Sequence, residues 1–189
     1  MSDSDWLIWI DCEMTGLDVQ EHVLLEIAVM LSSGDLKEVV EGPSFIIRQS
    51  AAKLDGMNDW CKRQFGWRSA EDFDADKLAA QSLRSTVTEK QAEEAILQFL
   101  RDNGVAEKKA VLAGNTVHMD KRFIDKYLPK LADYMHYRII DVSTVKELCR
   151  RWKPEIFAKA PQKKATHRAM DDIKESIREL AFYQQHFLR

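Results

Sequence analysis

The sequence predicts an α/β fold with a mixed five-stranded sheet flanked by helices. Three strand-like apolar segments come first, a mostly helical region follows, and two further apolar segments then alternate with helices. Strands in succession, followed by alternation of strand and helix, are typical of α/β proteins with a mixed sheet. The order of the elements therefore predicts the fold class.

Three segments near the N-terminus are predicted to be strands. Residues 6–11 (WLIWID) form a short apolar run that ends in an acid, as buried strands often do. Residues 23–31 (VLLEIAVML) are the second strand. Residues 39–47 are the third, which we expect to be interrupted at Gly42-Pro43.

A mostly helical region is predicted over residues 51–104. Its clearest helix begins at Thr88, which forms a capping box with Gln91, and stops at Gly104. Within this region, residues 66–76 are the segment that we expect to be the most variable or mobile loop.

The second half of the chain alternates strand and helix. Residues 110–113 and 138–142 are predicted strands, each with a helix after it. The last helix is expected over residues 168–187, where apolar residues recur on one face (Met170, Ile173, Ile177 and Leu180).

Composition indicates a soluble enzyme or module of one domain, residues 1–189. The 189 residues are 45% hydrophobic and 31% charged, with no internal repeat or Gly/Pro linker. No stretch approaches the ~18 apolar residues that span a membrane, so no membrane partner is expected. The P-loop, GxGxxG and HExxH motifs are missing, which removes support for the chemistries they serve.

The net charge and the cysteine content further limit which functions and which cellular compartment are compatible with the sequence. The net charge of −3 argues against a protein that coats long nucleic acid, although a short strand held by few contacts remains compatible. The three cysteines are far apart and form no CxxC pair, which favours a reducing compartment over disulfides or zinc. Because no presequence is evident at the start, we expect a cytoplasmic protein, with the mitochondrion left open.

The first group of candidate functional residues is Asp11 and Glu13, at the end of the first strand. Alternate residues share one face of a strand, so the two carboxylates point the same way, ~6–7 Å apart along the chain. Such a pair can hold a hard divalent cation such as Mg²⁺. The simpler alternative is that both acids are merely solvated.

Asp120 is the second candidate. It follows the fourth strand and precedes Phe123 and Ile124 by three and four residues, which places it on the apolar side of a helix. A carboxylate there is costly unless it is paired or binds a metal. The alternative is an acid that accepts hydrogen bonds from free backbone N–H groups at the helix start.

The third group comprises His167, Asp171 and Asp172, near the start of the final helix. Five positions separate His167 from Asp172, so the two converge only if the histidine precedes the helix. A histidine in a loop suits a general base, because its ordinary pKa is near neutrality. Helical periodicity alone does not choose between Asp171 and Asp172.

Together the groups have the order Asp-x-Glu, Asp, His-x-Ala-x-x-Asp, which resembles that of the DEDDh exonucleases of the ribonuclease H-like superfamily. Longer strings are similar to those of the oligoribonuclease family: EMTGL, EGP, HYRIIDVSTVKELCRRWKPE and THRAMDDIKES. The resemblance covers nearly the whole chain, implies a ribonuclease H-like exonuclease fold, and selects Asp172 over Asp171.

The resemblance implies hydrolysis of RNA from the 3′ end. Asp11, Glu13, Asp120 and Asp172 would hold two Mg²⁺ or Mn²⁺ ions at the scissile phosphate, where paired ions stabilise both the attacking and the leaving oxygen. His167 would deprotonate the attacking water. The products would be a nucleoside 5′-monophosphate and a shortened RNA.

The resemblance also implies substrate contacts and a homodimer. Leu17 and Trp60 would enclose a terminal base, although Trp60 could instead be a core residue of an amphipathic helix. Thr116 stands where the family usually has serine near the terminal phosphate. The partner subunit would offer four residues to the distal 5′ end: Tyr137, Arg138, Ser143 and Lys146. Such composite sites would favour single-stranded RNA of about two to five nucleotides.

Three departures from the family pattern stand out. Cys12 replaces the usual leucine between the two acids, but its side chain should face away from the metals. Phe65 stands where the family often has a histidine, which puts one substrate contact in doubt. Residues 66–81 are longer than usual and suggest no function.

Three other functions compete with this one. DCEMTG superficially resembles the motif of aspartyl-phosphate phosphatases, but Glu13 stands where their second aspartate should be. A non-catalytic RNA-binding module predicts that a metal ligand is missing, whereas every ligand is present. An exonuclease acting on longer RNA or DNA 3′ ends is the closest alternative; the acidic charge and the 5′ contacts count against it.

Overall fold

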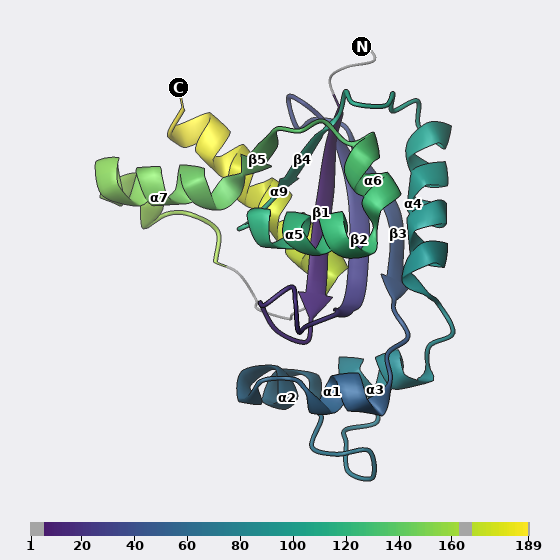
Figure 1. The fold of residues 1–189 in the computed structure, drawn as a ribbon. Helices are drawn as coiled ribbons and strands as arrows, with labels where there is room; N and C mark the ends of the chain where they lie inside the picture. The colour runs from purple at the N-terminus through teal and green to yellow at the C-terminus, as the bar shows by residue number, and fades with distance from the viewer. Residues whose placement is uncertain (1–5, 163–167, 189) are drawn as a thin grey trace.

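A computed structural model describes residues 6–162 and 168–188. Its five-stranded sheet has the order β3-β2-β1-β4-β5 (Figure 1). β1 pairs with β2 and β2 with β3 in antiparallel fashion, whereas β1–β4 and β4–β5 are parallel. The strands are β1 (Trp6–Met14), β2 (Leu24–Ser33), β3 (Val39–Ile46), β4 (Val111–Gly114) and β5 (Ile139–Asp141). The predicted mixed α/β sheet is confirmed.

Helices cover both faces of the sheet. They are α1 (Ala51–Asp55), α2 (Asp59–Phe65), α3 (Leu78–Arg84), α4 (Glu89–Asp102), α5 (His118–Tyr127), α6 (Pro129–Tyr134), α7 (Val142–Trp152), α8 (Pro154–Phe157) and α9 (Ala169–His186). In Figure 1, α5 and α6 lie in front of the sheet and α9 behind it. The predicted capping box of α4, formed by Thr88 and Gln91, is present. No helix among the described residues is long and apolar enough to cross a membrane.

The alternation of β1 divides the core between the two faces. Ile8, Ile10 and Cys12 belong to the cluster that contains α4, α5 and α6 residues, whereas Leu7 and Trp9 belong to the cluster with α7 and α9. Because successive strand residues face opposite sides, Asp11 and Glu13 continue the Leu7–Trp9 row toward α9. The fold thus brings the end of β1 beside the start of α9.

The third strand differs from the expectation of a break at Gly42-Pro43. β3 continues through both residues, and its register against β2 shifts between Ala28 and Met30. Proline lacks the N–H that a ladder needs, but β3 is an edge strand and a bulge accommodates the missing donor. A side chain at position 42 would come within 2.7 Å of the Val29 carbonyl, so glycine permits the close approach of β2.

Helices α1, α2 and α3 form a group beyond the C-terminal end of β1 (Figure 1). Their own apolar cluster includes buried Leu54, Phe65 and Trp67. Residues 66–76, predicted to be a variable or mobile loop, are fastened to this cluster. The Trp67 ring stacks on Phe73 with centroids 5.4 Å apart, and Arg68 forms ion pairs with the Asp72 and Asp74 carboxylates.

Candidate active site

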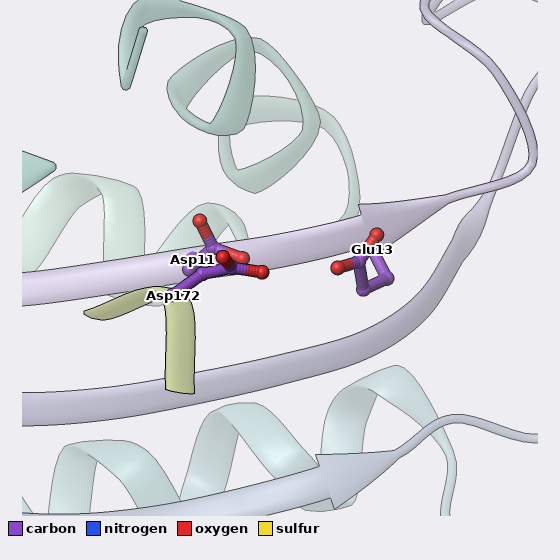
Figure 2. Close-up of side chains that lie close together, drawn as sticks. All are labelled: Asp11, Glu13 and Asp172. Atoms are coloured by element: carbon purple, nitrogen blue, oxygen red, sulfur yellow. The ribbon is translucent and has the colours of Figure 1, made fainter. Parts of the chain in front are cut away.

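Three carboxylates meet where β1 ends and α9 begins. Oxygens of Asp11, Glu13 and Asp172 lie within 4.8 Å of one another (Figure 2). Asp11 and Glu13 come from the same face of β1, and Asp172 comes from the first turn of α9. Oxygen ligands from several carboxylates are what hard divalent cations prefer, so the group fits a metal such as Mg²⁺ or Mn²⁺.

Asp120 approaches the same place from the other side of β1. Its Oδ1 accepts a hydrogen bond from the Cys12 backbone N–H at 2.9 Å, and the residue is only 6% exposed. It lines a cavity of about 450 Å³ together with Asp11, Glu13 and Asp172. Asp120 is thus brought to the site, although it is not part of the group within 4.8 Å. The Cys12 side chain packs in the core on the α5 side of the sheet.

Burial, with a smaller effect of neighbouring negative charges, raises the affinity of Glu13 and Asp120 for protons. Burial, followed by the negative charges of Asp172 and Glu26, raises the pKa of Glu13 to about 8. Burial likewise raises the pKa of Asp120, against the lowering effect of the Cys12 hydrogen bond. A cation that binds Glu13 must displace its proton, so metal affinity should increase with pH up to about 8.

The structure shows which of the two aspartates at the start of α9 joins the other acids. The Asp172 carboxylate joins Asp11 and Glu13, whereas Asp171 is exposed and lies outside that group. α9 begins at Ala169, so Asp172 belongs to its first turn, as the proposed convergence with His167 requires. His167 itself lies outside the described residues, and its role as a general base stays a prediction.

An ion pair between a buried acid and a half-exposed arginine, which the sequence did not lead us to expect, anchors this part of α9. Glu26 is 1% exposed and stands opposite Glu13 across the β1–β2 ladder. Its carboxylate accepts two hydrogen bonds from the Arg168 guanidinium, both at 3.1 Å. The Arg168 carbonyl in turn accepts from the Asp172 N–H at 3.0 Å. The acid inside the apolar run VLLEIAVML was the sequence signal for this pair.

An apolar pocket adjoins the carboxylates. It has a volume of about 510 Å³, and both Leu17 and Trp60 line it, with Glu13 and Met14 shared with the carboxylate cavity. Trp60 is 50% exposed, which contradicts the alternative of a core residue. Phe65, the departure from the family pattern, is buried and meets the Trp60 ring edge-on, with centroids 6.4 Å apart. Phe65 therefore supports the tryptophan wall, where a histidine would add a polar group.

A part of the carboxylate cavity outside the apolar pocket, here called its polar end, is lined by Asn115 and Thr116. Thr116 lines it, and its hydroxyl lies 3.0 Å from the Ser143 hydroxyl of the same chain. Lys146 forms an ion pair with Glu179 at 3.0 Å. Ser143 thus contacts a residue that lines the cavity of its own chain, whereas the resemblance assigned Ser143 and Lys146 to the partner's site.

Tyr137 and Arg138 are not brought to the carboxylate cavity. The Tyr137 side chain is 75% exposed, and the Arg138 guanidinium lies over its ring, 5.4 Å from the centroid. Tyr137 instead lines a separate hollow of about 550 Å³ with Lys108, Lys121 and His136. The assignment of these two residues to a partner's site stays a prediction.

The chain is similar to known exonucleases in sequence and in fold. A family model described as "Exonuclease" matches residues 8–180. Solved structures of exonuclease I share the fold: one has a TM-score of 0.72 at 14% identity and covers 98% of this chain. An E. coli complex with single-stranded DNA has a TM-score of 0.71 at 13% identity. The chain spans only 42% of either exonuclease I chain, so these two show the fold alone.

Among exonucleases, this chain is similar over nearly its whole length to several oligoribonucleases. Mitochondrial oligoribonuclease of Homo sapiens is 46% identical over 97% of this chain and 73% of its own. The oligoribonuclease of Paracidovorax citrulli is 49% identical over 96% and 89%, respectively. That of Chromobacterium violaceum is 42% identical over 99% and 98%. The chain therefore belongs to the oligoribonuclease family of exonucleases.

Proposed function

We propose that this protein is a 3′-to-5′ exoribonuclease that degrades short RNA to nucleoside 5′-monophosphates. The observation that carries the proposal is the continuity of the site. The apolar pocket of Leu17 and Trp60 shares Glu13 and Met14 with the carboxylate cavity. A terminal base held between the two side chains would place its phosphate beside the acids, and stacking of this kind accepts any base.

Two Mg²⁺ or Mn²⁺ ions are the proposed cofactors, with Asp11, Glu13, Asp120 and Asp172 as ligands. The donor set is entirely carboxylate, which suits hard cations better than zinc. When bound, such ions stabilise charge on the oxygens of the phosphate and lower the pKa of coordinated water. The acids hold their positions because β1, the first turn of α5 and the first turn of α9 fix them. His167 is the proposed base that accepts a proton from the attacking water.

The preference for short RNA is proposed to come from the polar end of the cavity. Thr116, Ser143 and Lys146 offer hydroxyl and ammonium donors that suit the 5′ phosphate of an RNA of about two to five nucleotides. Tyr137 and Arg138 would complete the site of a second copy, which would make the protein a homodimer with composite sites. A cytoplasmic location, with the mitochondrion as alternative, stays a prediction.

A length series with 5′-labelled RNA of two, five and twenty nucleotides tests this function, with Mn²⁺ or EDTA present. We expect metal-dependent loss of single nucleotides from the 3′ end, fastest on the shortest RNA, because the polar end limits strand length. Equal or faster attack on the longest RNA would favour the alternative, an exonuclease acting on longer RNA or DNA ends. Binding without cleavage would favour a non-catalytic RNA-binding module.

A further inference from the structure

Glu179 is a buried acid that the proposed chemistry does not use. It lies on α9, and its side chain is 3% exposed. Its two oxygens accept hydrogen bonds from Asn115 Nδ2 at 3.1 Å and Tyr183 OH at 3.1 Å, and pair with Lys146 Nζ at 3.0 Å. A carboxylate so far from water is stable only when it is fully partnered, so each partner is held firmly in place.

Asn115, one of these partners, links Glu179 by hydrogen bonds to residues at the carboxylate cavity. Asn115 donates its amide hydrogens to Glu179 and, at 2.8 Å, to Ser176. The Asn115 carbonyl oxygen is thereby turned toward Ser143, whose hydroxyl donates to it at 3.0 Å. Because a serine has a single hydroxyl proton, Thr116 must be the donor in its contact with Ser143. Glu179 thus sets the direction of the hydrogen bonds as far as Thr116.

Lys146, a second partner of Glu179, carries a positive charge. Lys146 is 34% exposed, and its ammonium has three N–H groups, of which the Glu179 pair occupies one. The other two N–H groups have no partner among residues 6–162 and 168–188, so they can meet an anion. Without Glu179 the long lysine side chain would sample many rotamers, so the ion pair pre-organises it.

The Thr116 backbone is itself held in an uncommon conformation. Its φ is 56°, in the left-handed region that β-branched residues rarely adopt. The Thr116 N–H donates to the Asp141 carboxylate at 2.9 Å, and the same oxygen caps the start of α7 through the Ser143 N–H. This strained placement keeps the Thr116 hydroxyl at the wall of the carboxylate cavity.

We propose that Glu179 is a positioning residue that gives the site its preference for RNA with a 5′ phosphate. It does so by fixing the Lys146 ammonium and the Thr116 and Ser143 hydroxyls as a ready-made phosphate clamp. The inference rests on the proposed function, which supplies the RNA. It differs from a purely structural role, in which Glu179 would only fasten α9 to α7 and the substrate preference would not depend on it.

The test compares Glu179→Gln with Tyr183→Phe, each assayed on a dinucleotide RNA with a 5′ phosphate and on the same RNA with a 5′ hydroxyl. Tyr183→Phe removes a hydrogen bond from the same carboxylate without touching Asn115 or Lys146. We expect Glu179→Gln to reduce the preference for the 5′ phosphate by about tenfold, mostly through KM, because charge-assisted hydrogen bonds are affected. Tyr183→Phe should keep the preference.

Other results separate the inference from the proposed function. An unchanged or increased preference in Glu179→Gln, or an equal loss in both variants, would overturn the positioning role. A wild-type protein that cleaves both dinucleotides equally well would also overturn it, while the proposed function would stand. Cleavage of neither RNA would remove both. If Glu179→Gln does not fold, Lys146→Met at the exposed end of the pair must show the same loss of preference for the inference to survive.

Discussion

Replacing Asp172 with asparagine should reduce RNA hydrolysis by on the order of 10³-fold, while the fold is retained. Asp172→Asn keeps the size of the side chain but removes one of the three clustered carboxylates that would bind the metal. The residue is partly exposed, and it contributes no apolar surface to the core. The measurement is kcat on a short RNA with saturating Mn²⁺, together with a circular dichroism spectrum.

Asp171→Asn is the matched control for this prediction. It removes the same charge from the same helix turn, but Asp171 is exposed and lies outside the carboxylate group. We expect activity within about twofold of the wild type, because surface substitutions have small effects. Equal activity in the two variants would contradict the assignment of Asp172 as a metal ligand.

Replacing Arg168 with alanine should destabilise the protein by about 3 kcal/mol, because it leaves a buried carboxylate without its partner. Glu26 is 1% exposed and would lose two hydrogen bonds, keeping only longer contacts with the Ser44 hydroxyl at 3.3 Å and the Ala169 N–H at 3.5 Å among the described residues. The effect would be seen as a lower urea midpoint with an unchanged slope.

Glu26→Gln should destabilise the protein less than Arg168→Ala does. The Arg168 side chain is 46% exposed, so water can solvate the guanidinium when the carboxylate charge is lost. Combining the two changes as Glu26→Gln/Arg168→Ala should cost less than Arg168→Ala alone, since no buried charge is left. A smaller effect for Arg168→Ala than for Glu26→Gln would show that the pair is not the anchor of α9.

The fold was predictable because local sequence patterns indicate the order of its strands and helices. The WLIWID run marks β1, and the Thr88–Gln91 capping box marks α4. Strand alternation also predicts that Asp11 and Glu13 share a face, which the structure places toward α9. The continuity of β3 across Gly42-Pro43 was missed, because whether a proline breaks a strand depends on whether that strand lies at the edge of the sheet.

Contacts between residues far apart in the chain could not be predicted from local sequence patterns. Arg168 and Glu26 are 142 positions apart, and no periodicity links them. Glu179 appeared as one more polar residue of the last helix, although it is buried among partners from two other elements. Helical spacing likewise left Asp171 and Asp172 equivalent. The distinction between them depends on where α9 meets β1, which only the folded chain determines.

The most direct test of the central claim is product analysis with metal-stripped protein and an RNA of five nucleotides. The claim is that the carboxylates at the end of β1 and the start of α9 form a metal-dependent nuclease centre. We expect mass spectrometry to find nucleoside 5′-monophosphates only after Mn²⁺ or Mg²⁺ is added, because the crowded acids cannot stabilise a phosphate without a cation. Cleavage that persists in EDTA, or products that carry a 3′ phosphate, would contradict it.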